Sequence, residues 1–271
     1  MTADSLPPIG IGTWQNTDPD QCARTVANAL EMGYRHVDTA RFYGNEEHVG
    51  AGIERADVPR EDVFLATKVH PEAEGAAYDE IHEGVEKSLS LLGVDVLDLL
   101  YIHWPVGNYE ASETLAAFDD LSDDGVIRNV GVSNFSVELL EEAMDVLDAP
   151  LFAHQVERHP LLPQPDLVSH ARAHDYTLVA YSPLGRGEAL SLPEVESVAE
   201  KHDISPAQAC LAWATHPEHV VAIPKATGEA HLRDNLGAAD VELDPEDVER
   251  IDGVEERERF VERDGAPWKG S

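Results

Sequence analysis

Lysine is scarce in this sequence of 271 residues: it occurs only at positions 68, 87, 201, 225 and 269. Asp and Glu number 53 against 19 Lys and Arg together, which gives a formal net charge of −34 at pH 7. Proteins that bind nucleic acids need a cationic surface that displaces condensed counterions. Because this chain has no basic cluster, we expect no nucleic-acid partner.

Cysteine and long apolar runs are also rare. Cys22 and Cys210 are the two cysteines, and both fall in helix-like segments, so we expect small buried thiols rather than a disulfide. No apolar run approaches the roughly 18 residues of a membrane-spanning helix, so we expect no membrane partner. The start, Met1 to Pro8, has no basic segment followed by an apolar stretch. We therefore expect no secretory signal and a cytoplasmic location.

The excess of acidic residues predicts a dependence on salt. A surface this negative repels itself and destabilises the compact state in dilute buffer. Molar salt shortens the Debye length to about 3 Å and removes most of that repulsion. We therefore expect a halophilic protein, from a cell with a very salty interior, that needs salt for stability.

Short runs rich in Val, Ile and Leu alternate with helical patterns along the whole chain, which is typical of βα units around a parallel sheet. The length is close to the roughly 250 residues of one (β/α)8 barrel. We predict a single α/β domain of the TIM-barrel class over residues 1–271, in which 264–271 is a loosely held tail. The eight predicted strands are Ile9–Gly12, Arg35–Asp38, Val63–Thr67, Leu97–Ile102, Ile127–Val132, Phe152–Val156, Thr177–Ala180 and Val220–Ile223.

The intervening segments carry helix signals. Apolar residues recur at helical spacing from Ile81 to Leu92, and Gly93 is expected to end that helix. Three other segments place a capping oxygen before a proline at the first helical position: Asp18-Pro19, Ser205-Pro206 and Asp244-Pro245.

Polar side chains occur at or just beyond the ends of several predicted strands. The carboxyl ends of the strands of a barrel share one rim, where barrel enzymes place their catalytic groups. Side chains far apart in sequence are therefore expected to meet there. They are Asp38, Tyr43, Lys68, His103, Asn134 and Gln155.

This set suits the protonation of an alkoxide. Tyr43 has an ordinary pKa of about 10 and releases its proton more readily when a cation stabilises the phenolate. Lys68 would be that cation, and a buried lysine needs a carboxylate partner, for which Asp38 is placed on a neighbouring strand. His103 would donate a hydrogen bond to the substrate oxygen.

Eight segments, in chain order from Ile9 to Leu236, resemble those of the aldo-keto reductases. The similarity is to short prokaryotic-type members of the diketogluconate reductase-like branch. The segments are Gly10-Ile-Gly-Thr-Trp14, Asp38-Thr-Ala-Arg-Phe-Tyr43-Gly-Asn-Glu46, Ala66-Thr-Lys68, Ile102-His103-Trp104-Pro105, Gly131-Val-Ser-Asn134-Phe135, Gln155, Tyr181-Ser-Pro-Leu-Gly185 and Ile223-Pro-Lys225.

The resemblance implies roles for individual residues. Tyr43 would be the general acid, Lys68 and Asp38 its tuning pair, and His103 the group that orients the substrate. The resemblance implies no metal. The substrate would contact Trp14, Phe42, His103 and Trp104. The implied cofactor-binding residues are Thr13, Trp14, Ser133, Asn134, Gln155, Tyr181, Ser182, Leu184, Gly185, Lys225, Thr227, His231, Asp234 and Asn235.

The cofactor implied is a nicotinamide dinucleotide. No Gly-x-Gly-x-x-Gly follows a strand and opens a helix, so a Rossmann domain is not supported. Instead Gly185-Arg-Gly187 stands where the resembled family has a loop over the pyrophosphate. Two positions depart from that family's usual phosphate contacts, since Ala226 replaces a serine and His231 an arginine. We therefore favour NADPH only modestly, and NADH stays open.

The sequence thus predicts an oxidoreductase that transfers hydride from NAD(P)H to a small aldehyde or ketone. Two alternatives remain: a Schiff-base lyase that uses Lys68 as its nucleophile, and a non-catalytic sensor that binds the nicotinamide and reports redox state. The sequence says little about assembly, and a monomer is slightly favoured.

Overall fold

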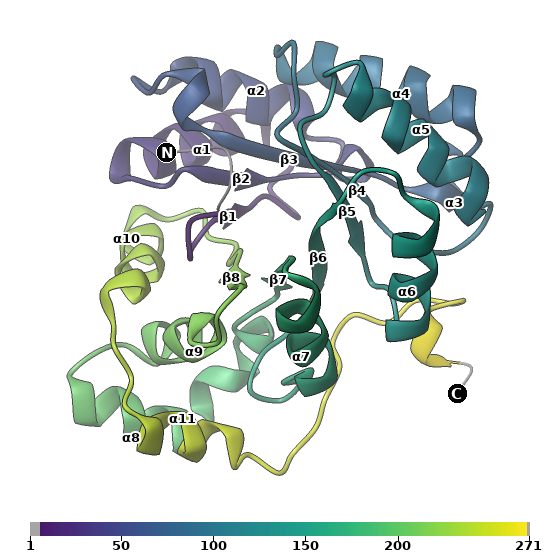
Figure 1. The fold of residues 1–271 in the computed structure, drawn as a ribbon. Helices are drawn as coiled ribbons and strands as arrows, with labels where there is room; N and C mark the ends of the chain where they lie inside the picture. The colour runs from purple at the N-terminus through teal and green to yellow at the C-terminus, as the bar shows by residue number, and fades with distance from the viewer. Residues whose placement is uncertain (1–5, 270–271) are drawn as a thin grey trace.

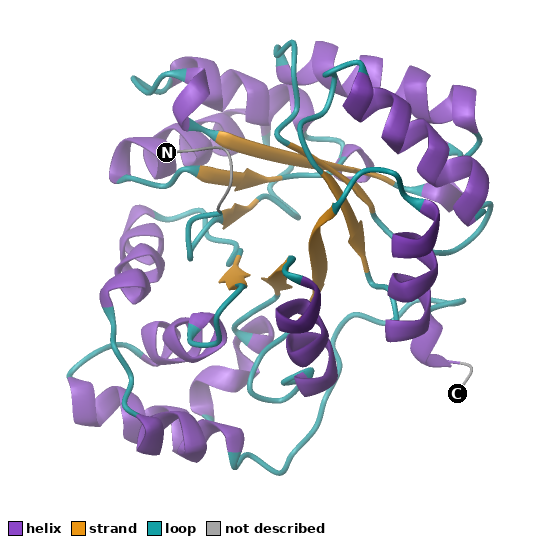
Figure 2. Ribbon diagram, viewed as in Figure 1, coloured by secondary structure: helices purple, strands orange, loops and turns teal. Residues whose placement is uncertain are grey.

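A computed structural model describes residues 6–269. Residues 1–5, in the segment where we expected no secretory signal, and residues 270–271, at the end of the predicted tail, lie outside the described residues. Eight strands form one sheet in chain order, each parallel to the next. Figures 1 and 2 show the strands in the middle and the helices around them. The strands are β1 (Ile11–Gly12), β2 (His36–Asp38), β3 (Phe64–Val69), β4 (Leu99–Ile102), β5 (Val130–Ser133), β6 (Leu151–Glu157), β7 (Thr177–Tyr181) and β8 (Val220–Ala222).

The sheet closes into a barrel between its first and last strands. Ile9 forms a parallel bridge with Ala222, and the backbone N–H of Gly10 donates to the carbonyl oxygen of Ala222 at 2.8 Å. This closure leaves no long unpaired edge in the sheet. The predicted (β/α)8 TIM-barrel fold is therefore confirmed.

Helices connect the strands and cover the outside of the barrel. Short 3-10 helices are η1 (Arg41–Tyr43), η2 (Arg60–Asp62), η3 (Gly185–Ser191), η4 (Ala238–Asp240) and η5 (Pro267–Lys269). The α-helices are α1 (Pro19–Met32), α2 (Glu46–Arg55), α3 (Pro71–Glu74), α4 (Tyr78–Leu92), α5 (Ala111–Asp123), α6 (Val137–Val146), α7 (Pro165–His174), α8 (Pro193–His202), α9 (Pro206–Thr215), α10 (Glu229–Gly237) and α11 (Pro245–Asp252). None of the helices within 6–269 is long and apolar enough to cross a membrane.

The predicted helix signals are confirmed. α4 ends at Gly93, whose φ of 68° is left-handed. Asp18 accepts from the backbone N–H of Gln21 at 2.8 Å at the start of α1, and Ser205 forms a capping box with Gln208 at the start of α9. Each cap satisfies backbone donors that the first turn leaves unpaired.

Six of the eight strand starts differ from the prediction by one to three residues, those of β4 and β5 by two and three. We expected strands from Leu97 and Ile127, but these two residues form only an isolated bridge with each other. Asp98 lies between Leu97 and β4, and its carboxylate accepts hydrogen bonds from the backbone N–H of Leu65 and from Arg60. A buried, hydrogen-bonded Asp interrupts the apolar run, so the regular strand β4 begins at Leu99, two residues later than predicted.

The core has two layers. The inner layer, enclosed by the strands, is small and contains Leu6, Ala66, Leu99, Tyr101, Ala153, Val179, Val221 and Ile223. The outer layer, between strands and helices, holds most of the buried apolar residues, including Cys22 and Cys210. Both thiols are free and buried, and burial raises the pKa of Cys22 to about 11 and that of Cys210 to about 12. They are protonated, as predicted for core residues.

Candidate active site

A cavity of about 230 Å³ opens at the carboxyl ends of the strands. Most of the residues singled out from the sequence line it. The members of that set are Thr13, Trp14, Asp38, Phe42, Tyr43, His103, Trp104, Ser133, Asn134, Gln155, Tyr181, Ser182 and Lys225. Residues from widely separated parts of the chain thus meet at the carboxyl ends of the strands.

Lys68 and Asp38 form a buried ion pair beneath this cavity. Lys68 lies inside β3 rather than beyond its end, because the strand runs to Val69. Its ammonium donates to Oδ1 of Asp38 and to the carbonyl oxygen of Thr39, the latter at 2.7 Å. Both side chains are almost completely buried. Burial lowers the pKa of Lys68, and the Asp38 carboxylate opposes that shift.

Tyr43 lies above this pair, at the end of η1. Its ring centroid is 5.4 Å from the ammonium of Lys68 and 5.7 Å from the imidazole centroid of His103. Burial, followed by the nearby Asp38 carboxylate and Tyr181, raises the pKa of Tyr43 well above its ordinary value. We expected Lys68 to make this phenol more acidic, and the pKa moves in the opposite direction because burial dominates. The hydroxyl is therefore protonated at neutral pH.

His103 follows β4 directly and reaches the same cavity. Burial lowers its pKa well below the ordinary value, and the positive charge of Lys68 adds to the effect. The imidazole is therefore neutral at physiological pH and carries one N–H donor. Within residues 6–269 its Nδ1 atom is buried and has no hydrogen-bond partner.

A network of amide groups forms another side of the cavity. Tyr181 donates from its hydroxyl to Oδ1 of Asn134 at 2.8 Å. Asn134 in turn donates to Ser133 Oγ and to the backbone carbonyl oxygen of His103, each at 3.0 Å. Gln155 donates to Oδ2 of Asp38 at 2.7 Å. These bonds fix the orientation of four polar side chains around one space.

Four of the eight non-glycine residues with positive φ within residues 6–269 lie at this end of the barrel. Gln15, Asn134, Ser182 and Arg186 have φ values between 49° and 64°, in the left-handed region that side chains other than Gly seldom adopt. Each such residue costs of the order of 1–3 kcal/mol and persists where the surroundings enforce it.

A second cavity of about 350 Å³ continues from the first and shares with it Trp14, Ser182, Arg186 and Lys225. Leu184 lies in its wall, and the guanidinium of Arg186 lies 5.3 Å from the ring centroid of Trp14. The two cavities together form an elongated trough. Gly185, Arg186 and Gly187 have positive φ, which turns the chain sharply at its side.

Four predicted cofactor residues at or near α10 do not line either cavity as delimited by residues 6–269: Thr227, just before the helix, and His231, Asp234 and Asn235 on it. Lys225 and His231 are exposed, and Thr227 is half-buried. Asn235 is buried. Asp234 accepts a hydrogen bond from Ser205 Oγ at 2.7 Å, so its carboxylate already has a partner in α9's cap.

Part of the wall of the first cavity comes from residues that the sequence did not predict. Trp14, Phe42 and Trp104, which we expected to contact the substrate, do line the cavity, and Trp14 and Phe42 are 40% and 51% exposed. The C-terminal segment also lines it, through 261–263, as does His70 after β3. No strand or helix pattern marks the C-terminal segment in the sequence.

Glu157, at the end of β6, holds this segment in place. Its carboxylate accepts hydrogen bonds from the backbone N–H groups of Phe260 and Val261 at 2.7 and 3.0 Å. Further along, Ala266 is buried and Trp268 packs on Trp104 with ring centroids 5.5 Å apart. Residues 264–269 of the tail that we expected to be loose are thus in contact with the pocket wall.

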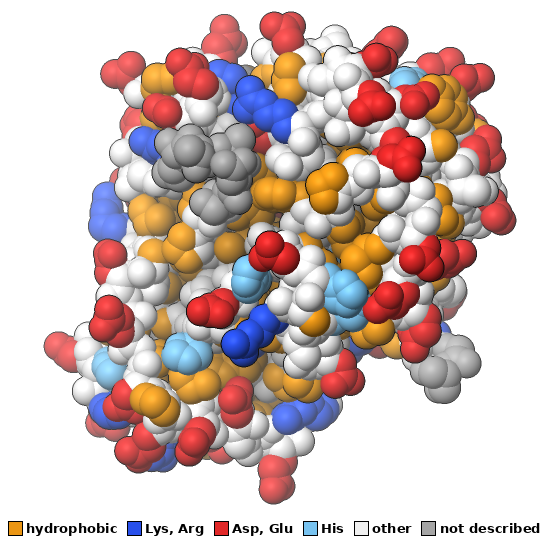
Figure 3. Space-filling view, in the orientation of Figure 1, with side chains coloured by type: hydrophobic (Ala, Val, Ile, Leu, Met, Phe, Trp, Pro, Cys, Tyr) orange, Lys and Arg blue, Asp and Glu red, His pale blue; other side chains and the backbone are white. Residues whose placement is uncertain are grey.

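Basic side chains are enriched around the trough relative to the rest of the protein, since three of them line it against two acidic ones, Asp38 and Glu262. Lys225, Arg186 and Arg263 line the two cavities, in a chain with 53 acidic and 19 basic residues. Elsewhere acidic side chains dominate, as around the periphery of the face in Figure 3. A concentration of cations in an acidic protein favours an anionic ligand.

Comparison with known proteins gives the family. The model of the aldo/keto reductase family matches residues 8–256. An aldo-keto reductase of Mycobacterium sp. (strain JLS) is 40% identical over 95% of this chain and 92% of its own length. The glyoxal reductase of Bacillus subtilis is 39% identical over 94% and 91%. The methylglyoxal reductase of Escherichia coli O157:H7 is 35% identical over 96% and 97%.

Solved structures agree. A crystal structure provisionally described as a 2,5-diketo-D-gluconic acid reductase B superposes with a TM-score of 0.91 at 33% identity, over 96% of this chain and 92% of that one. An aldo-keto reductase from a Medee basin deep-sea metagenome gives 0.90 at 34% identity, over 95% and 94%. Proteins of this kind use nicotinamide cofactors. The chain therefore belongs to the aldo/keto reductase family and is an oxidoreductase.

Proposed function

We propose that the protein reduces small aldehydes and ketones with NAD(P)H and that Tyr43 is the general acid. The observation that carries the proposal is the arrangement of four side chains. The buried Lys68–Asp38 pair lies beneath Tyr43, and the neutral imidazole of His103 lies beside Tyr43 at the same cavity. Relatives named as glyoxal and methylglyoxal reductases, together with a cavity of about 230 Å³, support small carbonyl compounds as substrates.

The proposed proton transfer follows from the pKa directions. Tyr43 keeps its proton at neutral pH because its pKa is raised. An alkoxide is far more basic than a phenolate, so it takes that proton readily as it develops. His103, as a neutral donor, holds the carbonyl oxygen of the substrate beside the Tyr43 hydroxyl. The ammonium of Lys68 is the nearest positive charge to the phenolate that remains, and Asp38 keeps it charged.

The residues of the trough fit a nicotinamide dinucleotide. Its elongated shape matches an extended ligand, and the exposed Lys225 and Arg186 match the charge of phosphates. Ser133, Asn134 and Gln155 would hold the carboxamide, and the Tyr181 ring would stack on the nicotinamide. When bound, the reduced nicotinamide supplies the hydride to the carbonyl carbon.

We propose that both NADPH and NADH are accepted, with NADPH modestly preferred. Lys225 is exposed beside the trough and is available to a 2′-phosphate. Ala226 is buried and apolar, and His231 on α10 replaces the arginine expected there. With Lys225 as the cation and no serine hydroxyl at position 226, a 2′-phosphate lacks a bidentate partner.

The two alternatives are less well supported. A Schiff-base lyase needs an amine that reaches the substrate, yet Lys68 is fully buried and its ammonium is engaged by Asp38 and Thr39. A redox sensor has no use for a protonated Tyr43 beside a neutral His103. We also keep the cytoplasmic location and the monomeric state as predictions.

The test is a panel of aldehydes and ketones, including glyoxal and methylglyoxal, at molar KCl with NADPH or NADH. Consumption of the reduced nicotinamide is followed by absorbance. We expect turnover of small aldehydes with both cofactors. Tight cofactor binding without turnover of any carbonyl would favour the sensor. Trapping of substrate on Lys68 by borohydride would instead favour the lyase.

A further inference from the structure

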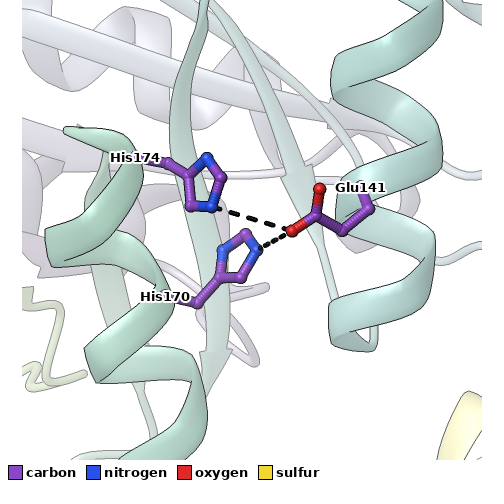
Figure 4. A group of neighbouring side chains, drawn as sticks. All are labelled: Glu141, His170 and His174. Atoms are coloured by element: carbon purple, nitrogen blue, oxygen red, sulfur yellow. Dashed lines mark hydrogen bonds and ion pairs between the residues drawn. The ribbon is translucent and has the colours of Figure 1, made fainter.

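Three side chains on the outside of the barrel face one another, away from the cavity described above. Glu141 is on α6, and His170 and His174 are on α7. Figure 4 shows both imidazoles directed from α7 toward the Glu141 carboxylate. Nε2 of His170 lies 3.0 Å from Oε1 of Glu141, and Nε2 of His174 lies 3.7 Å from the same oxygen.

The spacing along α7 produces this convergence. His170 and His174 are four residues apart, so they project from the same face of the helix. Their rings stack with centroids 4.2 Å apart and an angle of 19° between planes. The Nε2 atoms of His170 and His174 therefore point toward one position, which the Glu141 carboxylate reaches from α6.

The separations match those around a zinc ion. Zinc binds imidazole nitrogen and carboxylate oxygen at about 2.0–2.2 Å in tetrahedral geometry, so ligand atoms around it lie about 3.3–3.5 Å apart. The two distances to Glu141, 3.0 and 3.7 Å, bracket that value. One ligand atom from each of the three residues lies within 4.8 Å of the others. Small side-chain rotations bring all three into range.

A partner outside the cluster orients the first histidine. Nδ1 of His170 lies 2.9 Å from the hydroxyl of Tyr176, which is buried. When the Tyr176 oxygen accepts a hydrogen bond from Nδ1–H, the lone pair of His170 is on Nε2, the atom that faces Glu141. Metal-binding histidines commonly have such a partner on their other nitrogen. The His170 side chain itself is only 8% exposed, which limits its rotation.

We propose that Glu141, His170 and His174 form a binding site for one zinc ion, with water as the fourth ligand. Two imidazoles and one carboxylate favour zinc over the magnesium or calcium ions that acidic surfaces attract, because those ions prefer all-oxygen sites. The bound ion ties α6 to α7 and stabilises the folded chain. This proposal uses none of the residues of the reductase site and stands apart from its chemistry.

The test is calorimetric titration of the full chain with Zn²⁺ in molar KCl, with millimolar MgCl2 present to occupy nonspecific acidic sites. We expect one Zn²⁺ per chain. His170→Gln and His174→Gln should each weaken binding at least about tenfold, and Tyr176→Phe should weaken it about tenfold through loss of the orienting hydrogen bond. Zn²⁺ at a hundredfold excess over Kd should raise Tm by about 5 °C in the parent chain.

His219→Gln is the matched control. His219 pairs with a carboxylate, Asp175, at 3.7 Å, but belongs to no three-ligand group among residues 6–269. We expect it to bind Zn²⁺ like the parent. Each variant is compared by circular dichroism and Tm without zinc, so a folding defect is recognised. Binding that MgCl2 abolishes, or that persists unchanged in a folded His170→Gln/His174→Gln variant, would overturn the proposal.

Discussion

Gln155 on β6 donates a hydrogen bond to Oδ2 of Asp38 on β2, 2.7 Å away and 117 positions earlier in the chain. The other carboxylate oxygen of Asp38 accepts from Lys68. Each oxygen thus has its own partner, from a different strand. The carboxylate is therefore part of the packing of the barrel mouth as well as of the proposed chemistry.

Removing the charge of Asp38 tests this double role. Asp38→Asn leaves the Lys68 ammonium buried without a counter-charge, which we expect to lower the free energy of unfolding by about 3–5 kcal/mol. Urea unfolding in molar KCl measures the loss. The double variant Asp38→Asn/Lys68→Met, which buries no unpaired charge, should recover most of the stability and remain inactive. An Asp38→Asn variant as stable as the parent would contradict this account.

A second prediction concerns the loss of stability at acidic pH through Asp247 on α11, which contacts Lys201 and His202 on α8. Burial alone would raise the pKa of Asp247, but hydrogen bonds from Lys201 and His202, each 2.7 Å long, and one from the backbone N–H of Asp244 lower it to about 2. A carboxyl whose pKa is depressed by folding stabilises the native state above its unfolded pKa, near 3.8, and loses that contribution as pH falls toward 2.

Asp247→Asn should therefore lower stability at pH 5, where the carboxylate is ionised in both states of the parent. The difference between parent and variant should shrink between about pH 4 and pH 2. Urea unfolding across this range, at fixed molar KCl, measures it. A difference that stays constant down to pH 2 would rule out the depressed pKa.

Substitutions at two positions test the proposed modest preference for NADPH over NADH. The double variant Ala226→Ser/His231→Arg restores a hydroxyl and a guanidinium beside Lys225. We expect it to bind NADPH about tenfold more tightly, with unchanged affinity for NADH, since charged hydrogen bonds contribute about 1.5–3 kcal/mol. Fluorescence titration measures both affinities.

Arg233→Gln is the control for that variant. Arg233 lies two residues beyond His231 on α10, about 200° around the helix, and so faces away from His231. We expect unchanged binding of NADPH. A loss of NADPH affinity in this variant, or equal gains for both cofactors in the double variant, would oppose the assignment.

The acidic surface predicts a strong effect of salt. With a net charge of −34, we expect Tm to rise steeply between dilute buffer and molar KCl, as screening reduces repulsion among the carboxylates. Sucrose at matched water activity serves as control, because it stabilises folded proteins without screening charge. Equal Tm values in dilute buffer and molar KCl would refute a salt requirement.

The sequence predicted the barrel and much of the site because both depend on local patterns. An apolar run followed by a polar residue marks a strand end, and this rule alone placed Asp38, His103 and Asn134 at one rim. The motifs of the resembled family added Trp14 and Tyr181. Chain closure through Ile9 and Ala222 follows from the number of strands.

Other features depend on contacts that local patterns do not reveal. The pocket wall at 261–263 is set by hydrogen bonds to Glu157, about 100 positions away. The pKa of Tyr43 depends on how deeply it is buried, so its direction of shift was predicted wrongly. His170 and His174 are visibly four apart, but Glu141 meets them only once α6 and α7 are adjacent.

The central claim is that Tyr43 delivers the proton to the substrate oxygen. The most direct test compares the parent with Tyr43→Phe, measuring NADPH binding by fluorescence and turnover of methylglyoxal by absorbance in molar KCl. The account predicts unchanged NADPH affinity and a loss of kcat of about 10²-fold or more, since the phenyl ring keeps the packing but has no proton to give. Turnover equal to that of the parent would contradict it.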